Sequence, residues 1–252
     1  MTLQVVQLTD IHLCDDPNQF LLGVNPEKSF DRVLMFLRQQ PPPDLLLLTG
    51  DLTQEGGRLA YRRLKQKISA LGISTYYLPG NHDQLDAMTS ILNREDLGIN
   101  RSVLVKGWHL VLLNSAVPGR VEGQLGSHTL HWLGKTLKEY GDYPTLIALH
   151  HPVLPIGCSW LDRLSLQDSN LFWQICGDFP QVKGVITGHA HQEHDVFRFT
   201  RKGVIRCMVS PSTCAQFKAS TVEFATDSLP PGFRRLNLET KGSLTTVVHR
   251  VS

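Results

Sequence analysis

Cysteine is scarce in this sequence, and no two cysteines form a CxxC pair. The chain holds five, widely separated, at positions 14, 158, 176, 207 and 214. An odd and scattered set argues against both a disulfide scaffold and a cysteine-based zinc site. Free thiols are typical of a reducing compartment, so we expect a cytoplasmic protein.

An excess of charge of one sign and long apolar runs are also lacking. The 25 basic and 23 acidic residues leave a formal net charge of +2, too little to favour nucleic acid or an anionic membrane surface. No apolar run approaches the roughly 20 residues that a membrane-spanning helix needs. The first residues lack the basic and apolar regions of a signal peptide and are typical of a strand. We therefore expect a soluble protein with no membrane or nucleic-acid partner.

Strand and helix patterns alternate through the first three quarters of the 252 residues. With 41% hydrophobic and 19% charged residues, the composition favours one α/β domain over residues 1–252. The patterns predict strands over 3–10, 41–51, 74–83, 109–115, 145–152 and 183–191. They predict helices over 26–40, with Asn25 as N-cap and Pro26 first, and over 57–71, 84–93, 128–140 and 168–176. From about residue 196, alternating apolar and polar residues predict antiparallel strands that complete a second sheet, with helices outside.

Residues typical of metal sites follow the predicted strands at their ends. The last of these strands ends in "GHAH", where extended chain would point His189 and His191 to the same side. Earlier strands end in "TDIH", "TGD", "LPGNHD" and "LHHP", which contribute Asp10, His12, Asp51, Asn81, His82, Asp83, His150 and His151. In open α/β sheets, binding sites assemble at the C-terminal ends of the strands.

Each of these residues alone has an ordinary structural explanation, such as a cap or an Asx turn. Together they do not, because burying several unpaired carboxylates and imidazoles costs several kcal/mol. Metal ions compensate for that cost. Two aspartates, one asparagine and four histidines favour iron, manganese or zinc, and seven ligands exceed the needs of one ion. Two ions roughly 3.5–4 Å apart, bridged by one carboxylate, form an arrangement that clamps phosphoryl oxygens.

The ordered blocks Asp-x-His, Gly-Asp, Gly-Asn-His-Asp, His and Gly-His-x-His resemble those of the calcineurin-like metallophosphoesterases. Within that superfamily the chain resembles the bacterial class III cyclic-nucleotide phosphodiesterases, most closely those acting on 3′,5′-cyclic AMP. This likeness rests on "LLGVN" (21–25), "LPGNHD", "GCSWLD" (157–162), "GHAHQEHDV", "SPSTCAQFK" (210–218) and "GSLTTVVHR" (242–250), and so covers essentially the whole chain. It implies a four-layer αββα sandwich of two mixed sheets flanked by helices.

The resemblance also implies a ligand set and an activity. One metal ion would be held by Asp10, His12, Asp51 and His191, and the second by Asp51, Asn81, His150 and His189. The ions expected are iron or manganese, with zinc or cobalt as alternatives, because the same ligands accept all of them. The implied reaction is hydrolysis of 3′,5′-cyclic AMP to 5′-AMP by a metal-bridging hydroxide. His82 would face the phosphate as the catalytic residue, with Asn81 and His191 beside the substrate.

Several assignments around this centre stay open. Asp83 either orients His82 or caps a turn, and His151, like His194, has a packing or supporting role. Trp160 and Phe217 lie in loop-like stretches, where one of them stacks on adenine or both pack the loops. The remaining histidines, at positions 109, 128, 131 and 249, have ordinary surface or core roles.

The function also has alternatives. A broader phosphodiesterase of the same fold would act on 2′,3′-cyclic nucleotides, glycerophosphodiesters or nucleotide-linked lipids. A non-catalytic scaffold would have lost ligands or His82, and the sequence has lost none. A basic groove or an added capping domain would favour a nuclease, and the near-neutral charge and short chain disfavour one. The oligomeric state is a monomer or a homodimer, since an edge among the C-terminal strands could pair with a second copy.

Overall fold

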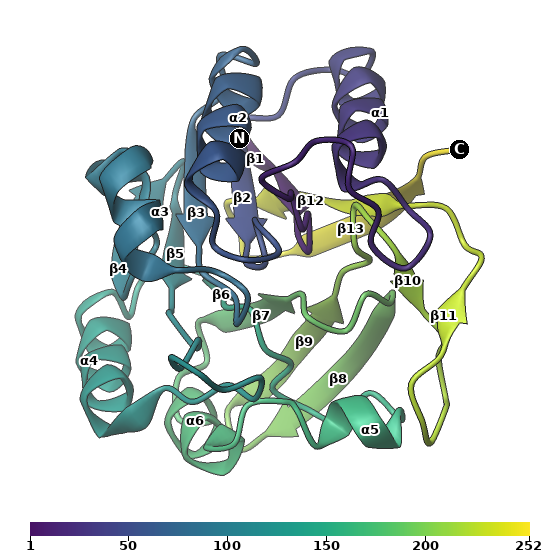
Figure 1. The fold of residues 1–252 in the computed structure, drawn as a ribbon. Helices are drawn as coiled ribbons and strands as arrows, with labels where there is room; N and C mark the ends of the chain where they lie inside the picture. The colour runs from purple at the N-terminus through teal and green to yellow at the C-terminus, as the bar shows by residue number, and fades with distance from the viewer.

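Two β-sheets lie face to face in the computed structural model, which describes residues 1–252 apart from the side chain of Arg94 (Figure 1). The five-stranded sheet has the order β13-β12-β1-β2-β3, with β1 Thr2–Leu8, β2 Leu45–Thr49, β3 Thr75–Leu78, β12 Gly232–Glu239 and β13 Leu244–Arg250. The six-stranded sheet has the order β4-β5-β6-β7-β9-β8, with β4 Arg101–Val105, β5 Trp108–Leu112, β6 Thr145–Ala148, β7 Val182–Thr187, β8 His194–Thr200 and β9 Gly203–Val209. Both sheets mix parallel and antiparallel pairs.

Helices cover the outer faces of both sheets (Figure 1). The five-stranded sheet packs against α1 Pro26–Arg38, α2 Arg58–Ser69 and α3 Leu85–Ile91, which precedes a short 3-10 turn at Arg94–Asp96. The six-stranded sheet packs against α4 Gly126–Glu139 and α6 Ser169–Cys176. The expected four-layer αββα sandwich is therefore confirmed. None of the described helices is long and apolar enough to cross a membrane.

The second strand shows how the sequence specifies these layers. All five residues of β2 are buried, as its unbroken apolar run predicted. Leu46 and Leu48 pack toward α1 and α2, whereas Leu45 and Leu47 pack against the other sheet. Burial of each such side chain contributes about 1.5–3 kcal/mol. A strand apolar on both faces is stable only between two covering layers, so β2 lies in the interior of the sandwich.

The first helix begins where the sequence predicted. Asn25 is the N-cap, and its side-chain oxygen accepts a hydrogen bond of 2.8 Å from the amide of Lys28. Pro26 follows at the first helical position. The amide group of Asn25 also donates to the carbonyl oxygens of Pro17 and Gln19. One residue thus begins α1 and anchors the loop that precedes it.

The strands after residue 193 are divided between the two sheets, although their pattern predicted that they would lie together in the second sheet. β8 and β9 extend the six-stranded sheet, but β12 pairs antiparallel with β1, from Thr2 opposite Glu239 to Gln7 opposite Arg234. Buried Arg234 connects the two groups through a 2.6 Å contact with Asp195 on β8. Strand periodicity indicates that an edge will pair, but not which sheet provides its partner.

Short elements account for the other differences between the predicted and the observed secondary structure. Strand β4 lies in a stretch for which no element was predicted, and "GCSWLD" contains the four-residue helix α5 Ser159–Asp162. A two-stranded ribbon, β10 Gln216–Phe217 and β11 Thr226–Asp227, forms apart from the large sheets. Propensity summed over so few residues is weak, so pairing and packing with the rest of the chain determine these elements.

Candidate metal centre

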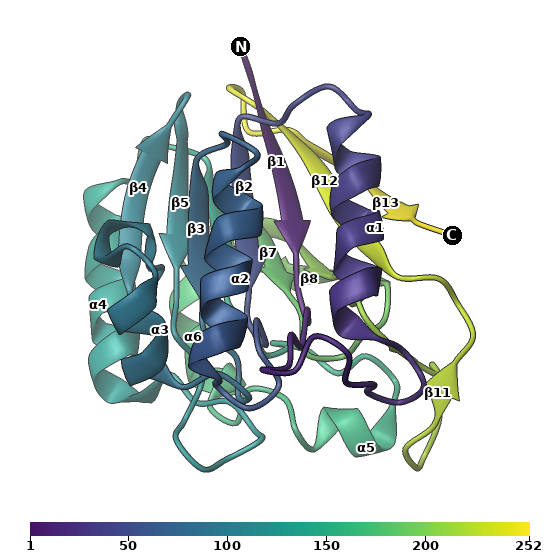
Figure 2. The same ribbon diagram turned by 45° about the horizontal axis from the view of Figure 1, so that its top comes forward.

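The parallel strands of both sheets end on the same edge of the sandwich. Figure 2 shows β1 and β5, which belong to different sheets, pointing the same way. The expected ligands follow strands of either sheet: Asp10 and His12 after β1, Asp51 after β2, Asn81 after β3, His150 after β6, and His189 and His191 after β7. We call these seven residues the ligand cluster.

The side chains of the ligand cluster converge around Asp51. Its Oδ2 lies 3.3 Å from His150 Nε2 and 3.7 Å from His12 Nε2. On one side, His191 Nε2 lies 3.4 Å from Asp10 Oδ1. On the other side, Asn81 Oδ1 lies 3.0 Å from His189 Nδ1 and 3.3 Å from His150 Nε2. All members except half-buried Asn81 are buried. The contacts therefore place Asp10 with His191 on one side of Asp51, and Asn81 with His150 and His189 on the other.

Main-chain and side-chain oxygens fix the orientation of three imidazoles in the cluster. His12 Nδ1 donates to Gln54 Oε1 at 2.7 Å, His150 Nδ1 to the Thr49 carbonyl at 2.8 Å, and His191 Nδ1 to the Ala215 carbonyl at 2.7 Å. A neutral imidazole carries one proton, so each Nε2 atom keeps a free lone pair. Supporting contacts of this kind are characteristic of histidines that bind metals.

The donor atoms fit cations. The Nε2 atoms of His12 and His191 lie only 3.0 Å apart, and in these tautomers neither carries a proton to donate to the other. His189 Nε2 is buried without a hydrogen-bond partner among the described residues, while its Nδ1 faces Asn81. Facing lone pairs and buried carboxylates repel one another unless a positive charge lies between them. Nitrogen and oxygen donors without sulfur suit iron, manganese or zinc.

The backbone of the cluster is left-handed at five positions. The φ angles are 52° at Asp10, 54° at His12, 50° at Asp51, 68° at His189 and 50° at His191. Strand β7 ends at Thr187, so the extended geometry assumed for His189 and His191 was wrong, although both imidazoles do reach the centre. A positive φ turns the chain sharply, and the hydrogen bonds from the His189 amide to both Asp10 carboxylate oxygens hold that turn.

Glycine at position 80 allows two of these loops to meet. A Cβ atom there would lie 2.2 Å from Asp51 Oδ1 and 2.4 Å from the Asp51 amide nitrogen, too close for any side chain. The loop that carries Asn81 therefore passes directly over Asp51 only because residue 80 has no side chain.

Opposing charges determine how the cluster titrates without metal. Burial alone would raise the pKa of Asp51, but His150 and His12 hold it well below its usual value. Burial alone would lower the pKa of His150, whereas Asp51 and Asp10 raise it to about 9. At His12 burial prevails over the carboxylates and lowers the pKa to about 4. Protonation of His150 is how the metal-free cluster compensates buried negative charge, and a bound cation would take over that role.

His82 and Asp83, which follow Asn81 in the chain, contact different groups. The His82 amide donates to Asp51 Oδ1 at 2.9 Å, and its Nδ1 donates to the carbonyl oxygen of Gln54 at 2.9 Å. The His82 side chain is half-buried, so part of it is open to a ligand. Asp83 makes no hydrogen bond with the His82 ring.

The Asp83 carboxylate has a structural environment. It accepts from the amides of Leu52, Thr53 and Gly80 and from the Tyr61 hydroxyl, at 2.7 to 3.2 Å. Burial and Asp51 raise its pKa to about 6. Of the two roles left open for Asp83, these contacts correspond to the cap.

The other residues expected near the centre lie around it. His151 is buried against His189, but its Nδ1 accepts from Ser115 Oγ at 2.8 Å and its Nε2 donates to the Val121 carbonyl at 2.9 Å. Both nitrogens are thus used, so it supports the cluster without offering a lone pair. Its pKa is lowered to about 3 by burial and by His150. His194 begins β8 and is not among the converging groups.

Phe217 stacks on His191, with ring centroids 4.0 Å apart and planes 5° from parallel. Trp160 and Phe224 each contact Phe217 at centroid distances of 5.4 and 5.3 Å, and together the three rings form an aromatic cluster beside His191. The indole nitrogen of Trp160 is buried without a hydrogen-bond partner among the described residues. Sequence reasoning missed Phe224 and Gln54, since neither lies in a strand-end motif and both reach the centre only through the folded loops.

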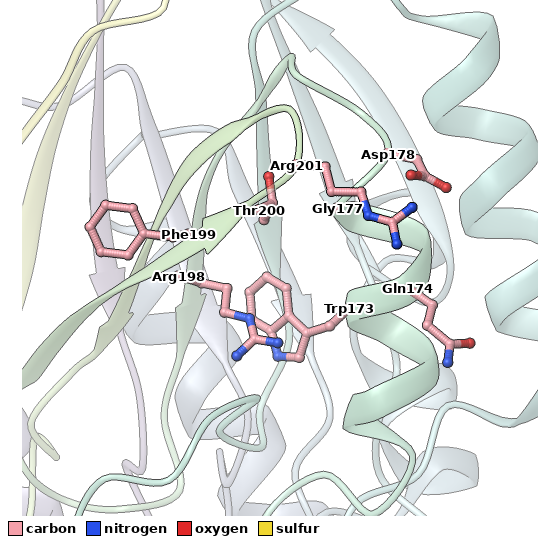
Figure 3. A pocket seen from close by; sticks show the side chains of 8 residues that line it. All are labelled: Trp173, Gln174, Gly177, Asp178, Arg198, Phe199, Thr200 and Arg201. Carbon is pink, nitrogen blue, oxygen red and sulfur yellow. The ribbon is translucent and has the colours of Figure 1, made fainter.

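A separate pocket of about 630 Å³ lies at the far end of β8 (Figure 3). Its lining comes from α6 and the residues just after it, and from the last residues of β8 with Arg201 in the following turn; it includes Trp173 and Arg198. The Arg198 guanidinium lies 5.7 Å from the centroid of the Trp173 ring. None of the eight lining residues belongs to the ligand cluster, so this pocket takes no part in the metal centre.

Comparisons with known proteins identify the family. Residues 3–193 match the calcineurin-like phosphoesterase family. The chain is 42% identical over its whole length to a 3′,5′-cyclic-nucleotide phosphodiesterase of Nostoc sp., covering 93% of that protein. It is 39% identical, over 99% of its length and 90% of the relative, to the 3′,5′-cyclic adenosine monophosphate phosphodiesterase CpdA of Escherichia coli.

Solved structures support the fold. A dimetal phosphatase from Danio rerio superposes with a TM-score of 0.67 at 13% identity, with 99% of each chain covered. A purple acid phosphatase from yellow lupin superposes with a TM-score of 0.68 at 15% identity, over 99% of this chain and 52% of that one. At such low identities the likeness concerns the arrangement of layers alone.

Proposed function

The chain belongs to the calcineurin-like phosphoesterase family, and we propose that it is a metal-dependent phosphodiesterase that hydrolyses 3′,5′-cyclic AMP to 5′-AMP. The observation that carries the proposal is the convergence of the seven-residue ligand cluster, with three imidazoles turned so that their Nε2 atoms face inward. The substrate is inferred from two relatives, a 3′,5′-cyclic-nucleotide phosphodiesterase and a 3′,5′-cyclic AMP phosphodiesterase, which share about two fifths of their residues with this chain over its whole length.

The cluster divides naturally between two metal ions. Asp10, His12 and His191 would hold one ion, Asn81, His150 and His189 the other, and Asp51 would bridge them. The contacts of Asp51 with both His12 and His150 support that division. We propose iron or manganese as the ions, with zinc or cobalt compatible with the same donors.

The protein groups supply orientation and proton transfer. Bound metal ions supply a water molecule of lowered pKa and neutralise charge on the phosphate oxygens. His82 is the proposed catalytic residue. Because its Nδ1 proton is held by the Gln54 carbonyl, a second proton on His82 would sit on Nε2. In that doubly protonated form Nε2 would donate to the phosphate or pass its proton to the leaving 3′ oxygen, and the neutral Nδ1–H form would remain. Asn81 and His191 would lie beside the substrate, and Asp83, His151, Trp160 and Phe217 would hold the surrounding loops.

The setting that we propose for this activity is the cytoplasm. All five cysteines are free and buried, which fits a reducing compartment. The partner is a small cyclic nucleotide, with neither nucleic acid nor membrane involved, and the enzyme acts as a monomer or a homodimer.

The proposal is tested by comparing substrates on protein of known metal content. Hydrolysis of 3′,5′-cyclic AMP, 2′,3′-cyclic AMP and bis(p-nitrophenyl) phosphate is measured before chelation, after it, and after manganese is restored. We expect a chelator-sensitive preference for 3′,5′-cyclic AMP. Turnover of only the other two diesters would reject the substrate and leave a broader phosphodiesterase. No turnover in metal-replete protein would reject the enzyme and leave a scaffold.

A further inference from the structure

Gln54 contacts two histidines of the centre through two different oxygen atoms. It lies in the loop between β2 and α2, three residues after Asp51. Its side-chain Oε1 accepts a 2.7 Å hydrogen bond from His12 Nδ1. Its main-chain oxygen accepts a 2.9 Å hydrogen bond from His82 Nδ1. A proposed metal ligand and the proposed catalytic residue are therefore attached to one residue.

The side-chain bond determines which nitrogen of His12 can bind a cation. With Nδ1 donating to Gln54, the proton of neutral His12 stays on that atom and the lone pair remains on Nε2. That Nε2 atom faces His191 and Asp51, at 3.0 and 3.7 Å. Without the acceptor, the imidazole could move its proton to Nε2 or rotate, and either change removes the lone pair from the centre.

The loop that carries Gln54 is fixed independently of its side chain. The neighbouring Thr53 donates its amide to Asp83 Oδ1 and accepts the Gly56 amide at 3.0 Å. Gln54 itself is half-buried, and its terminal NH₂ has no hydrogen bond to the described residues. Its side chain can therefore be changed while the main-chain oxygen that receives His82 stays in place.

We propose that Gln54 is a positioning residue, whose carboxamide oxygen keeps His12 in its metal-binding tautomer and whose main-chain oxygen aligns His82. This inference rests on the metal centre of the proposed function. The side-chain oxygen and the main-chain oxygen of Gln54 therefore have different roles. Loss of the carboxamide weakens metal binding, whereas the alignment of His82 survives any substitution of the side chain.

The test compares Gln54→Met, which removes the acceptor at similar length, with Gln54→Glu, which retains an oxygen. Affinity for Mn²⁺ is measured by calorimetry on metal-stripped full-length protein. We expect Gln54→Met to bind about 10–100-fold more weakly than wild type, as is usual when such supporting contacts are lost. Gln54→Glu should bind at least as tightly as wild type. Glu55→Gln, which alters an exposed neighbour, is the matched control and should leave the affinity unchanged.

Kinetics provide the second measurement. At Mn²⁺ concentrations that saturate each variant, kcat of Gln54→Met should stay within about threefold of wild type, because the His82 bond is to the main chain. Wild-type affinity in Gln54→Met, or equal weakening in Gln54→Met and Gln54→Glu, would overturn the inference. If Gln54→Met does not fold, Gln54→Ala makes the same comparison. Wild-type protein that binds no Mn²⁺ would overturn the metal centre as well, whereas one that binds it without hydrolysing cyclic AMP would overturn only the proposed substrate.

Discussion

The Nε2 atoms of His12 and His191 face each other at 3.0 Å, although each imidazole donates its Nδ1 proton to an oxygen elsewhere. Neither atom has a proton left to share with the other, so in these tautomers their contact is repulsive. The surrounding hydrogen bonds hold the two rings in this position. A cation held by both nitrogens would remove this repulsion.

Metal binding should stabilise the fold. At Mn²⁺ concentrations about 100 times Kd, binding adds about 2.7 kcal/mol to the free energy of unfolding. For a domain of this size the gain corresponds to a rise in Tm of roughly 5–10 °C. Differential scanning calorimetry of chelated and Mn²⁺-loaded protein measures it. His191→Ala should lose most of the rise, and His131→Ala, on the exposed face of α4, should keep it. An equal rise in both variants would show that Mn²⁺ binds elsewhere.

His82 and Asp51 should divide catalysis from metal binding. His82 touches Asp51 through its main-chain amide, which His82→Ala retains. That variant should keep its metal while kcat falls about 10²–10⁴-fold, the usual contribution of a general acid. Asp51→Ala should lose both, because the carboxylate contacts His12 and His150. Metal analysis of the purified variants measures their metal content, and steady-state kinetics measure kcat. Equal metal loss in the two variants would contradict this division.

Asp83 should matter for stability more than for turnover. Its half-buried carboxylate accepts three main-chain amides and the Tyr61 hydroxyl, so Asp83→Ala should lower the free energy of unfolding by roughly 3–5 kcal/mol. Tyr61→Phe removes one of these bonds and should cost roughly 1–2 kcal/mol. Urea unfolding measures both losses. If Asp83→Ala kept wild-type stability and lost kcat, Asp83 would instead orient His82.

His109, far from the ligand cluster in sequence and buried in β5, should make stability depend on pH. Burial lowers its pKa to about 4, and neutral His109 bonds with Ser102 and Thr145. In the unfolded chain the pKa is about 6.5, so between about pH 6.5 and 4 only the unfolded state is protonated. This stabilisation is complete above pH 6.5, and about 3 kcal/mol of it is lost as the pH falls to 4. Urea unfolding of chelated wild type and His109→Gln across this window should show a shallower pH slope in the variant; parallel slopes would exclude His109.

The aromatic cluster should hold His191 in place without binding the adenine base of the substrate. Phe217 covers one face of the His191 ring, so Phe217→Leu should weaken Mn²⁺ binding several-fold. Trp160 is packed against Phe217 and Phe224, and Trp160→Ala should leave KM for cyclic AMP within about twofold. A tenfold higher KM in Trp160→Ala, with Mn²⁺ affinity unchanged, would instead identify Trp160 as the residue that stacks on adenine.

The ligand cluster was predictable because two simple regularities coincide in this fold. Parallel strands end at one edge, and residues such as Asp51 and His150 follow apolar strands directly in the sequence. The unbroken leucines of β2 similarly indicate a strand buried on both faces. These signals are local, so they could be read from the sequence without knowing the partners of any strand.

The remaining features depend on contacts between distant segments. Nothing in the sequence places Gln54 beside His12, because the two lie 42 residues apart and meet only when the β1 and β2 loops fold together. The pairing of β12 with β1 is equally non-local. The left-handed backbone at His189 could not be predicted from the sequence either, because the pattern "GHAH" resembles a continued strand. Only the contact with Asp10 turns the chain there.

That left-handed backbone has a consequence for how the protein can change over time. Each non-glycine residue with positive φ costs about 1–2 kcal/mol, and five of the nine that the structure describes belong to the ligand cluster. The fold itself would be more stable with glycine at those positions. A descendant that no longer needed catalysis could therefore accept glycine or asparagine there and keep the sandwich intact. After loss of function, substitutions would therefore be expected first at these five positions, while the sheets and helices around them stayed the same.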